Sequence, residues 1–114
     1  PTYWYTVTSD MKRFLDRCYS LIQFPKNRSE WIGKYDGVGK FCVTAAVCEQ
    51  HEEKNMGNTL TLLTSFANDI GLNVLESVKA LNCFSAGSIQ NNKKSLADAE
   101  AAGLKLLHRL KSPT

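Results

Sequence analysis

One short run of the chain, residues 41–47, constrains the fold more than any other part of the sequence. It reads FCVTAAV, with β-branched and aromatic residues in its first half and almost no polar side chain. Such a run is typical of a β-strand that is covered on both faces, as the strands of parallel sheets are. We therefore expect a buried strand here.

A first helix is expected upstream of this strand. Thr8 is placed to cap its free backbone N–H groups, and Pro25 is expected to stop it, because proline cannot continue a helix. The remaining segment, residues 26–39, is predicted to be a polar connection. The apolar positions of the helix recur at helical spacing: Met11, Phe14, Leu15, Cys18 and Ile22.

A second helix and a second strand are expected after a polar loop over residues 48–57. Gly71 follows the helix, at the place of a left-handed C-cap. Residues 72–78 alternate imperfectly and predict the second strand. The apolar positions of the helix are Leu60, Leu63, Phe66, Ala67 and Ile70.

A third helix is expected to begin at Ser95, because the segment from Ser95 to Asp98 is similar to a capping box. Gly103 in its interior lowers helix stability by about 1 kcal/mol relative to alanine, which favours a role in close packing against a sheet. The expected inner face consists of Leu96, Ala99, Gly103, Leu106 and Leu110.

The resulting order of helix, strand, helix, strand and helix predicts an α/β domain with a parallel sheet. Two strands leave an edge unpaired and much of each helix face uncovered. We therefore expect further strands to precede residue 1, over roughly 60–80 residues if two βαβ-sized units are absent. Residues 1–114 would then be the C-terminal part of a single domain.

Composition narrows the partners and the compartment. The net charge is +3 and the basic residues are scattered, which does not indicate nucleic acid. The longest apolar stretch is shorter than the ~20 residues that span a bilayer, and no signal-peptide pattern opens the chain, so we expect a cytoplasmic protein. The cysteines lack metal-ligand spacing and are interpreted as buried thiols: Cys18, Cys42, Cys48 and Cys83.

Two groups of polar residues are candidate sites. His51 beside Glu52 and Glu53 is interpreted as solvated charge in a loop rather than as a metal or acid–base cluster. Three basic residues of the first helix are interpreted as an exposed face rather than as a dinucleotide-phosphate site: Lys12, Arg13 and Arg17. We expect no metal ligands in this chain.

The beginning of the chain carries the most specific motif. PTYW at residues 1–4, Thr8, and MKRFLDR at residues 11–17 together resemble the third strand-to-helix segment of the flavodoxin-like NAD(P)H-dependent FMN reductases. The multimeric flavodoxins, which are quinone reductases of the same superfamily, share this pattern. Weaker similarity follows at residues 39–40, at Gly71 and over residues 98–103.

This resemblance implies a flavodoxin-like, doubly wound parallel sheet of strand order 2-1-3-4-5 in a three-layer α/β/α arrangement. The present chain would supply the last two strands and the last three helices. FMN would bind at the carboxyl ends of the strands, with its phosphate held by the loop after the first strand.

The resemblance also implies which residues contact the flavin. Backbone groups of Thr2 and Tyr3 would orient the ring, and Tyr3, Trp4 and Tyr5 would supply aromatic surface beside it. The alternative is that these aromatics pack at a core edge or at a subunit interface. The implied cofactor-binding residues are Pro1, Thr2, Tyr3, Trp4, Tyr5, Ala46, Val47 and Cys48.

The function implied is an FMN-dependent oxidoreductase that passes hydride from NAD(P)H to a quinone, a free flavin or a similar small-molecule acceptor. The flavin would carry the chemistry without a catalytic side chain, and the subunits would form a homo-oligomer. Two alternatives stay open. One is an electron-transfer flavodoxin, against which the positive net charge argues. The other is a non-catalytic chain or fragment that serves association only, favoured by the missing phosphate-binding loop.

Overall fold

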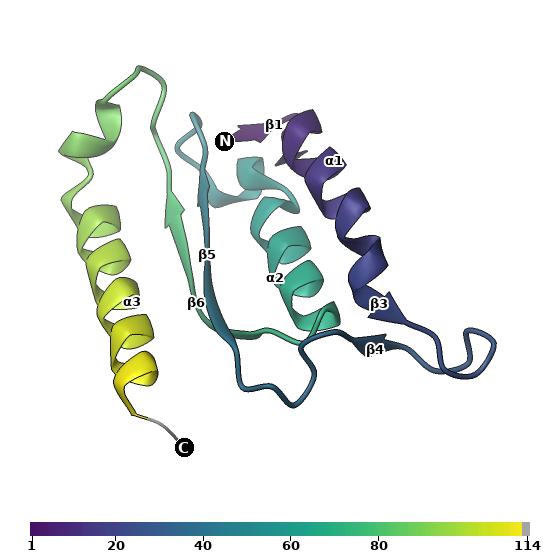
Figure 1. Cartoon of the computed structure of the whole chain (residues 1–114). Helices are drawn as coiled ribbons and strands as arrows, with labels where there is room; N and C mark the ends of the chain where they lie inside the picture. Colours follow the sequence, from purple (N-terminus) through teal and green to yellow (C-terminus); the bar gives the residue numbers. More distant parts are fainter. Residues whose placement is uncertain (113–114) are drawn as a thin grey trace.

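The centre of the structure is a pair of parallel strands, β5 (Phe41–Val47) and β6 (Asn73–Ala80). The structure is a computed structural model that describes residues 1–112. Helix α2 (Thr59–Asp69) connects the two strands, and α3 (Lys93–Lys111) follows β6 (Figure 1). The first strand is confirmed with the bounds predicted for it. The second strand begins one residue later than predicted and extends to Ala80.

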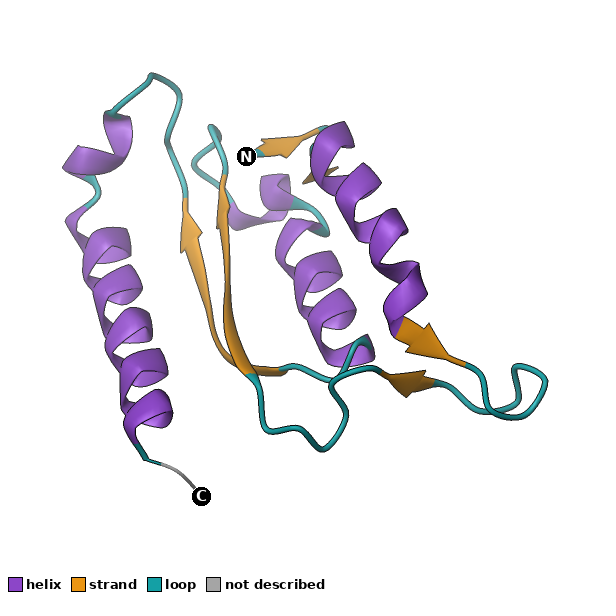
Figure 2. Cartoon of the chain, in the orientation of Figure 1, coloured by secondary structure: helices purple, strands orange, loops and turns teal. Residues whose placement is uncertain are grey.

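Helices cover the pair from opposite sides, as Figure 2 shows. On one face, the hydroxyl of Thr44 lies 2.8 Å from that of Ser77 and 3.5 Å from that of Thr64 in α2. On the other face, the guanidinium of Arg109 in α3 lies 5.5 Å from the centre of the Phe41 ring. The α/β class and the parallel pairing are therefore confirmed.

The sheet is smaller than the one expected. Within residues 1–112, β5 and β6 form a two-stranded sheet, and the other two sheets are two-stranded antiparallel pairs. The doubly wound order 2-1-3-4-5 stays a prediction.

The prediction that β5 is covered on both faces is wrong for its second half. Thr44 and Ala46 are buried beneath α2, whereas Ala45 and Val47 are exposed. Helix α3 leaves them open because it lies over β6 and over the beginning of β5. Its Ser95 hydroxyl, for example, donates to the carbonyl of Lys79 in β6 at 2.9 Å.

The first helix is shorter than predicted. Thr8 caps α1 (Ser9–Arg17) as expected, since its hydroxyl accepts from the N–H of Met11 at 3.1 Å. However, α1 ends well before Pro25 and passes through a 3₁₀ helix (Cys18–Leu21) into β3 (Ile22–Gln23). The extended backbone there lets β3 pair antiparallel with β4 (Ile32–Gly33), which lies inside the connection predicted to be irregular.

The end of α2 follows the prediction. Gly71 has a φ of +89°, and the N–H of Leu72 donates to the carbonyl of Ala67 at 2.9 Å. This is the left-handed cap that glycine provides without steric cost. It turns the chain from α2 directly into β6.

The start predicted for α3 is wrong by two residues. Asn92 is the N-cap, and its side-chain oxygen accepts from the N–H of Ser95 at 3.1 Å. The Ser95 hydroxyl is buried and bonded to β6, so it does not cap the helix. Asp98 does not complete a capping box either, because it forms an ion pair with Lys94 at 2.6 Å.

The inner face predicted for α3 is wrong except at Leu106, which is half-buried. Ala102 is buried, whereas Leu110 is 73% exposed and a Cβ added to Gly103 would meet no atom within 4 Å. Lys105 pairs with Glu76 of β6, and Arg109 lies over β5. The exposed stripe therefore lies on a different face of α3 from the buried Ala102. We call it the α3 stripe, and it consists of Leu96, Ala99, Gly103, Leu107 and Leu110.

All four cysteines are free thiols, but only Cys48 is fully buried, so the expectation of four buried thiols is only partly right. Burial raises the pKa of the Cys42 thiol above its ordinary value. The folded state therefore favours the protonated thiol.

This raised pKa predicts a pH dependence of stability. The contribution of Cys42 is fully present below the unfolded-state pKa of about 8.5 and is lost as pH rises through the folded-state value. We expect the free energy of unfolding to fall less steeply between pH 8 and 10 in Cys42→Ala than in the unmodified chain. Urea unfolding at several pH values measures both slopes, and parallel slopes would contradict the assignment.

Candidate functional site

The N-terminal residues, which resemble a strand-to-helix segment in sequence, form a small hairpin. Strand β1 (Thr2–Tyr3) pairs antiparallel with β2 (Thr6–Val7). The two turn residues, Trp4 and Tyr5, have φ angles of +47° and +65°. Positive φ at both central positions is the pattern of a type I′ turn, in which asparagine and glycine are usual. Bulky side chains at such angles are uncommon, and they cluster at functional sites.

The beginning of α2 anchors this hairpin. The N–H of Asn58 donates to the carbonyl of Tyr5 at 2.9 Å. The hydroxyls of Thr2 and Thr59 lie 3.0 Å apart, and the buried Thr59 hydroxyl also donates to the carbonyl of Met56 at 2.9 Å. The hairpin is thus held in place by Asn58 and Thr59 at the beginning of α2.

Gly57 permits this close approach. It has a φ of +56°, and a Cβ added to it would lie 2.0 Å from the carbonyl oxygen of Tyr5. A side chain at this position would collide with the turn backbone.

The hairpin and the loop after β5 border an open cavity of about 460 Å³. It lies at the carboxyl end of β5, the sheet edge at which open α/β proteins bind ligands. Its volume is within the range of small-molecule sites, roughly 300–1,000 Å³. We call it the hairpin cavity, and it is lined by Thr2, Tyr3, Trp4, Tyr5, Cys48, Glu49, Gln50 and Asn55.

The structure brings together most of the residues predicted to contact a cofactor. Residues 2–5 and Cys48 line the hairpin cavity. Pro1 and Ala46 line a different, smaller cavity of about 50 Å³ behind the hairpin, next to Met11. Val47 lines neither cavity, because alternation along the strand turns its side chain to the face opposite to that of Ala46 and Cys48.

Three lining residues were not predicted: Glu49, Gln50 and Asn55. They belong to the loop after β5, whose polar composition was noted in the sequence. The general rule that ligands bind beyond the carboxyl ends of parallel strands would have selected this loop as a whole.

The aromatic side chains of the hairpin do not pack at a core edge. Trp4 is 92% exposed, and Tyr3 and Tyr5 are more than half exposed. Exposed aromatic rings at the rim of a cavity offer flat, apolar surfaces to a planar ligand.

The loop after β5 contributes two amides and one carboxylate to the lining of the hairpin cavity. The side-chain amide of Gln50 donates to the Glu49 carboxylate at 3.0 Å, and Asn55 adds a second amide. Among the lining residues that the structure describes, none is lysine or arginine. A cavity wall without basic side chains suits the polar edge of a neutral ring better than it suits a negatively charged phosphate.

The polar residues of both candidate groups are exposed, and several of them form ion pairs. Glu52 pairs with Lys54 at 2.6 Å and lies 3.8 Å from His51, and Glu53 pairs with Lys79 at 2.6 Å. Over the described range, 1–112, no group of three or more His, Cys, Asp or Glu side chains is arranged to hold a metal ion. On the first helix, Lys12 forms an ion pair with Asp16.

Comparison with known proteins finds no matching family model, curated protein or solved structure. In the part of the chain that the structure describes, no helix has the length and apolar character needed to cross a bilayer.

Proposed function

We propose that the protein is an FMN-dependent oxidoreductase that transfers hydride from NAD(P)H to a small-molecule acceptor such as a quinone or a free flavin. The hairpin cavity carries this proposal. Its place at the carboxyl end of a parallel strand, its volume and its exposed aromatic rim match what the resemblance of residues 1–17 implies for a flavin site.

Within the proposed site, this chain binds and orients the ring. The rings of Tyr3, Trp4 and Tyr5 supply stacking surface, and the amides of Gln50 and Asn55 supply hydrogen-bonding groups for its polar edge. A bound flavin supplies the hydride chemistry itself, so the proposal assigns no catalytic side chain.

We propose that further strands pair with the outer edge of β5. Support comes from the outer edge of β5, which pairs with no strand within residues 1–112, and from the α3 stripe, an apolar helix face that the described residues leave exposed. An unpaired strand edge and an exposed apolar helix face are both surfaces that additional strands of a parallel sheet would cover. A phosphate-binding loop would belong to this additional part.

A comparison of two flavins tests the proposed site. Because no basic side chain lines the described cavity, we expect the 114-residue chain to bind riboflavin and FMN with dissociation constants that agree within about threefold. Titration followed by quenching of flavin fluorescence measures both constants. Absence of saturable binding of either flavin would contradict the proposed site.

Reduction distinguishes the catalytic proposal from the electron-transfer alternative. Flavin bound to the protein should lose its visible absorbance on anaerobic addition of NADPH or NADH. Bleaching by dithionite alone would instead favour a flavodoxin that carries electrons without hydride transfer.

One observation favours the alternative of association without catalysis. The unpaired edge of β5 and the α3 stripe offer surfaces for association with another subunit. That subunit can be a second copy of this chain, which would give a homo-oligomer. A colourless protein that takes up no added flavin but forms stable oligomers would support this alternative.

A further inference from the structure

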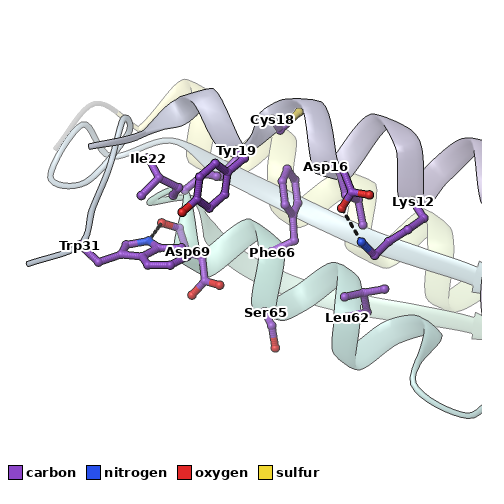
Figure 3. A pocket seen from close by; sticks show the side chains of 12 residues that line it. Lys12, Asp16, Cys18, Tyr19, Ile22, Trp31, Leu62, Ser65, Phe66 and Asp69 are labelled. Atoms are coloured by element: carbon purple, nitrogen blue, oxygen red, sulfur yellow. Dashed lines mark hydrogen bonds and ion pairs between the residues drawn. The ribbon is translucent and has the colours of Figure 1, made fainter. Parts of the chain in front are cut away.

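A second cavity, of about 210 Å³, lies between α1 and α2, away from the hairpin cavity. Figure 3 shows Trp31 and Tyr19 at one end of it and the Lys12–Asp16 ion pair at the other. We call it the α1–α2 groove. Its floor is apolar and is formed largely by Leu15, Ile22, Leu62, Phe66 and Ile70.

The aromatic end of the groove is held by specific contacts. The indole N–H of Trp31 donates to the carbonyl of Asp69 at 3.3 Å. The Trp31 ring meets the rings of Tyr19 and Phe24 edge-on, with centroids 6.2 Å and 5.6 Å apart. Arg28 donates to the Tyr19 hydroxyl at 2.9 Å. The aromatic wall is therefore fixed in position, although Trp31 and Tyr19 are each about half exposed.

Two cations at the groove are engaged elsewhere, Lys12 with Asp16 and Arg28 with the Tyr19 hydroxyl and the Phe24 ring, and neither pairs with Asp69. Asp69, which lines the groove, is the last residue of α2, where the helix dipole is negative, and the last turn of α2 contains no basic residue. Within residues 1–112, no ion pair engages Asp69, so its carboxylate and the end of the helix together favour a cation.

We propose that the α1–α2 groove binds a small organic cation, namely an ammonium group attached to an apolar or aromatic body. The ammonium would lie near Asp69 and the aromatic wall, because aromatic faces and a carboxylate both attract a cation. The apolar body would lie on the floor between the helices, and the small volume restricts it to about one ring with a short chain.

Phenethylammonium and its neutral analogue 2-phenylethanol test this proposal, because the two molecules share their apolar body. The chain contains two tryptophans, and Trp31 lines the groove whereas Trp4 lines the hairpin cavity. We expect phenethylammonium to shift the indole N–H resonance of Trp31 saturably and to leave that of Trp4 in place. The neutral analogue should bind at least about tenfold more weakly.

A matched pair of variants identifies the carboxylate. Asp69→Asn should weaken phenethylammonium binding about tenfold, because it removes the charge while keeping the shape. Glu100→Gln removes the same charge on α3, outside the groove, and should leave the affinity unchanged. Equal binding of the two analogues, equal effects of the two variants, or a shift of Trp4 without a shift of Trp31 would overturn the proposal.

Discussion

Replacement of Gly57 by alanine is expected to lower the free energy of unfolding by about 2–5 kcal/mol, the combined cost of a positive φ and of overpacking. The added Cβ would lie 2.0 Å from the carbonyl oxygen of Tyr5 and 2.4 Å from its Cβ. The turn backbone must move away to relieve this contact. Gly57→Ala should therefore also abolish flavin binding at the hairpin cavity.

Gly37→Ala is the matched control for this variant. Gly37 has a φ of +72°, but a Cβ added to it would meet no atom within 4 Å. The control therefore carries the backbone strain without the collision, and its cost should stay near 1–2 kcal/mol. Urea unfolding compares the two variants, and equal losses would show that Gly57 does not hold the hairpin against α2.

Met56→Ala is expected to cost about 2–5 kcal/mol, the usual range for a large-to-small change in a core. Met56 is 3% exposed and belongs to a buried cluster with Ala46 and Cys48 at the carboxyl end of β5. Its carbonyl also accepts the hydroxyl of Thr59, which contacts the hairpin. Loss of its side chain should therefore loosen the floor of the site as well as the fold.

The only other methionine of the chain provides the control. Met11 is 40% exposed on α1, so Met11→Ala should cost less than about 1 kcal/mol. Thermal unfolding of both variants measures the difference. Similar losses for the two methionines would contradict the burial that the structure assigns to Met56.

The central β5–α2–β6 unit could be predicted because its signals are long and regular. The apolar run of residues 41–47 and the helical periodicity that ends at Gly71 each extend over several residues. Local pattern and tertiary packing agree in this part of the chain.

Short elements could not be predicted, because strands of two residues have no periodicity. β3 and β4 are such strands, and the hairpin turn at Trp4 and Tyr5 lacks the asparagine or glycine that marks a type I′ turn. Their pairing depends on contacts with α2 that are distant in sequence.

The error in α3 has a different cause. Its leucine-rich stripe is the most apolar face of the helix, and periodicity selects that face as the inner one. In the described residues only β5 and β6 lie beneath α3, and the buried Ser95 and Ala102 meet them instead. Periodicity identifies an apolar face, but it does not say which neighbour covers that face.

The site was predicted only in part, again because a local pattern does not say which residues are neighbours in space. The motif selected the residues of the hairpin turn, and the place of Cys48 followed from the end of β5. Val47 was misplaced because a strand sends successive side chains to opposite faces, whereas Ala46 shares the face of Cys48 but lines the smaller cavity.

The most direct test of the flavin site records both tryptophan indole resonances during a titration with FMN. Trp4 lines the hairpin cavity and Trp31 lines the α1–α2 groove, so each reports on one place. Our account predicts a saturable shift of the Trp4 resonance with that of Trp31 unmoved. A shift confined to Trp31, or no shift of either resonance at saturating FMN, would contradict it.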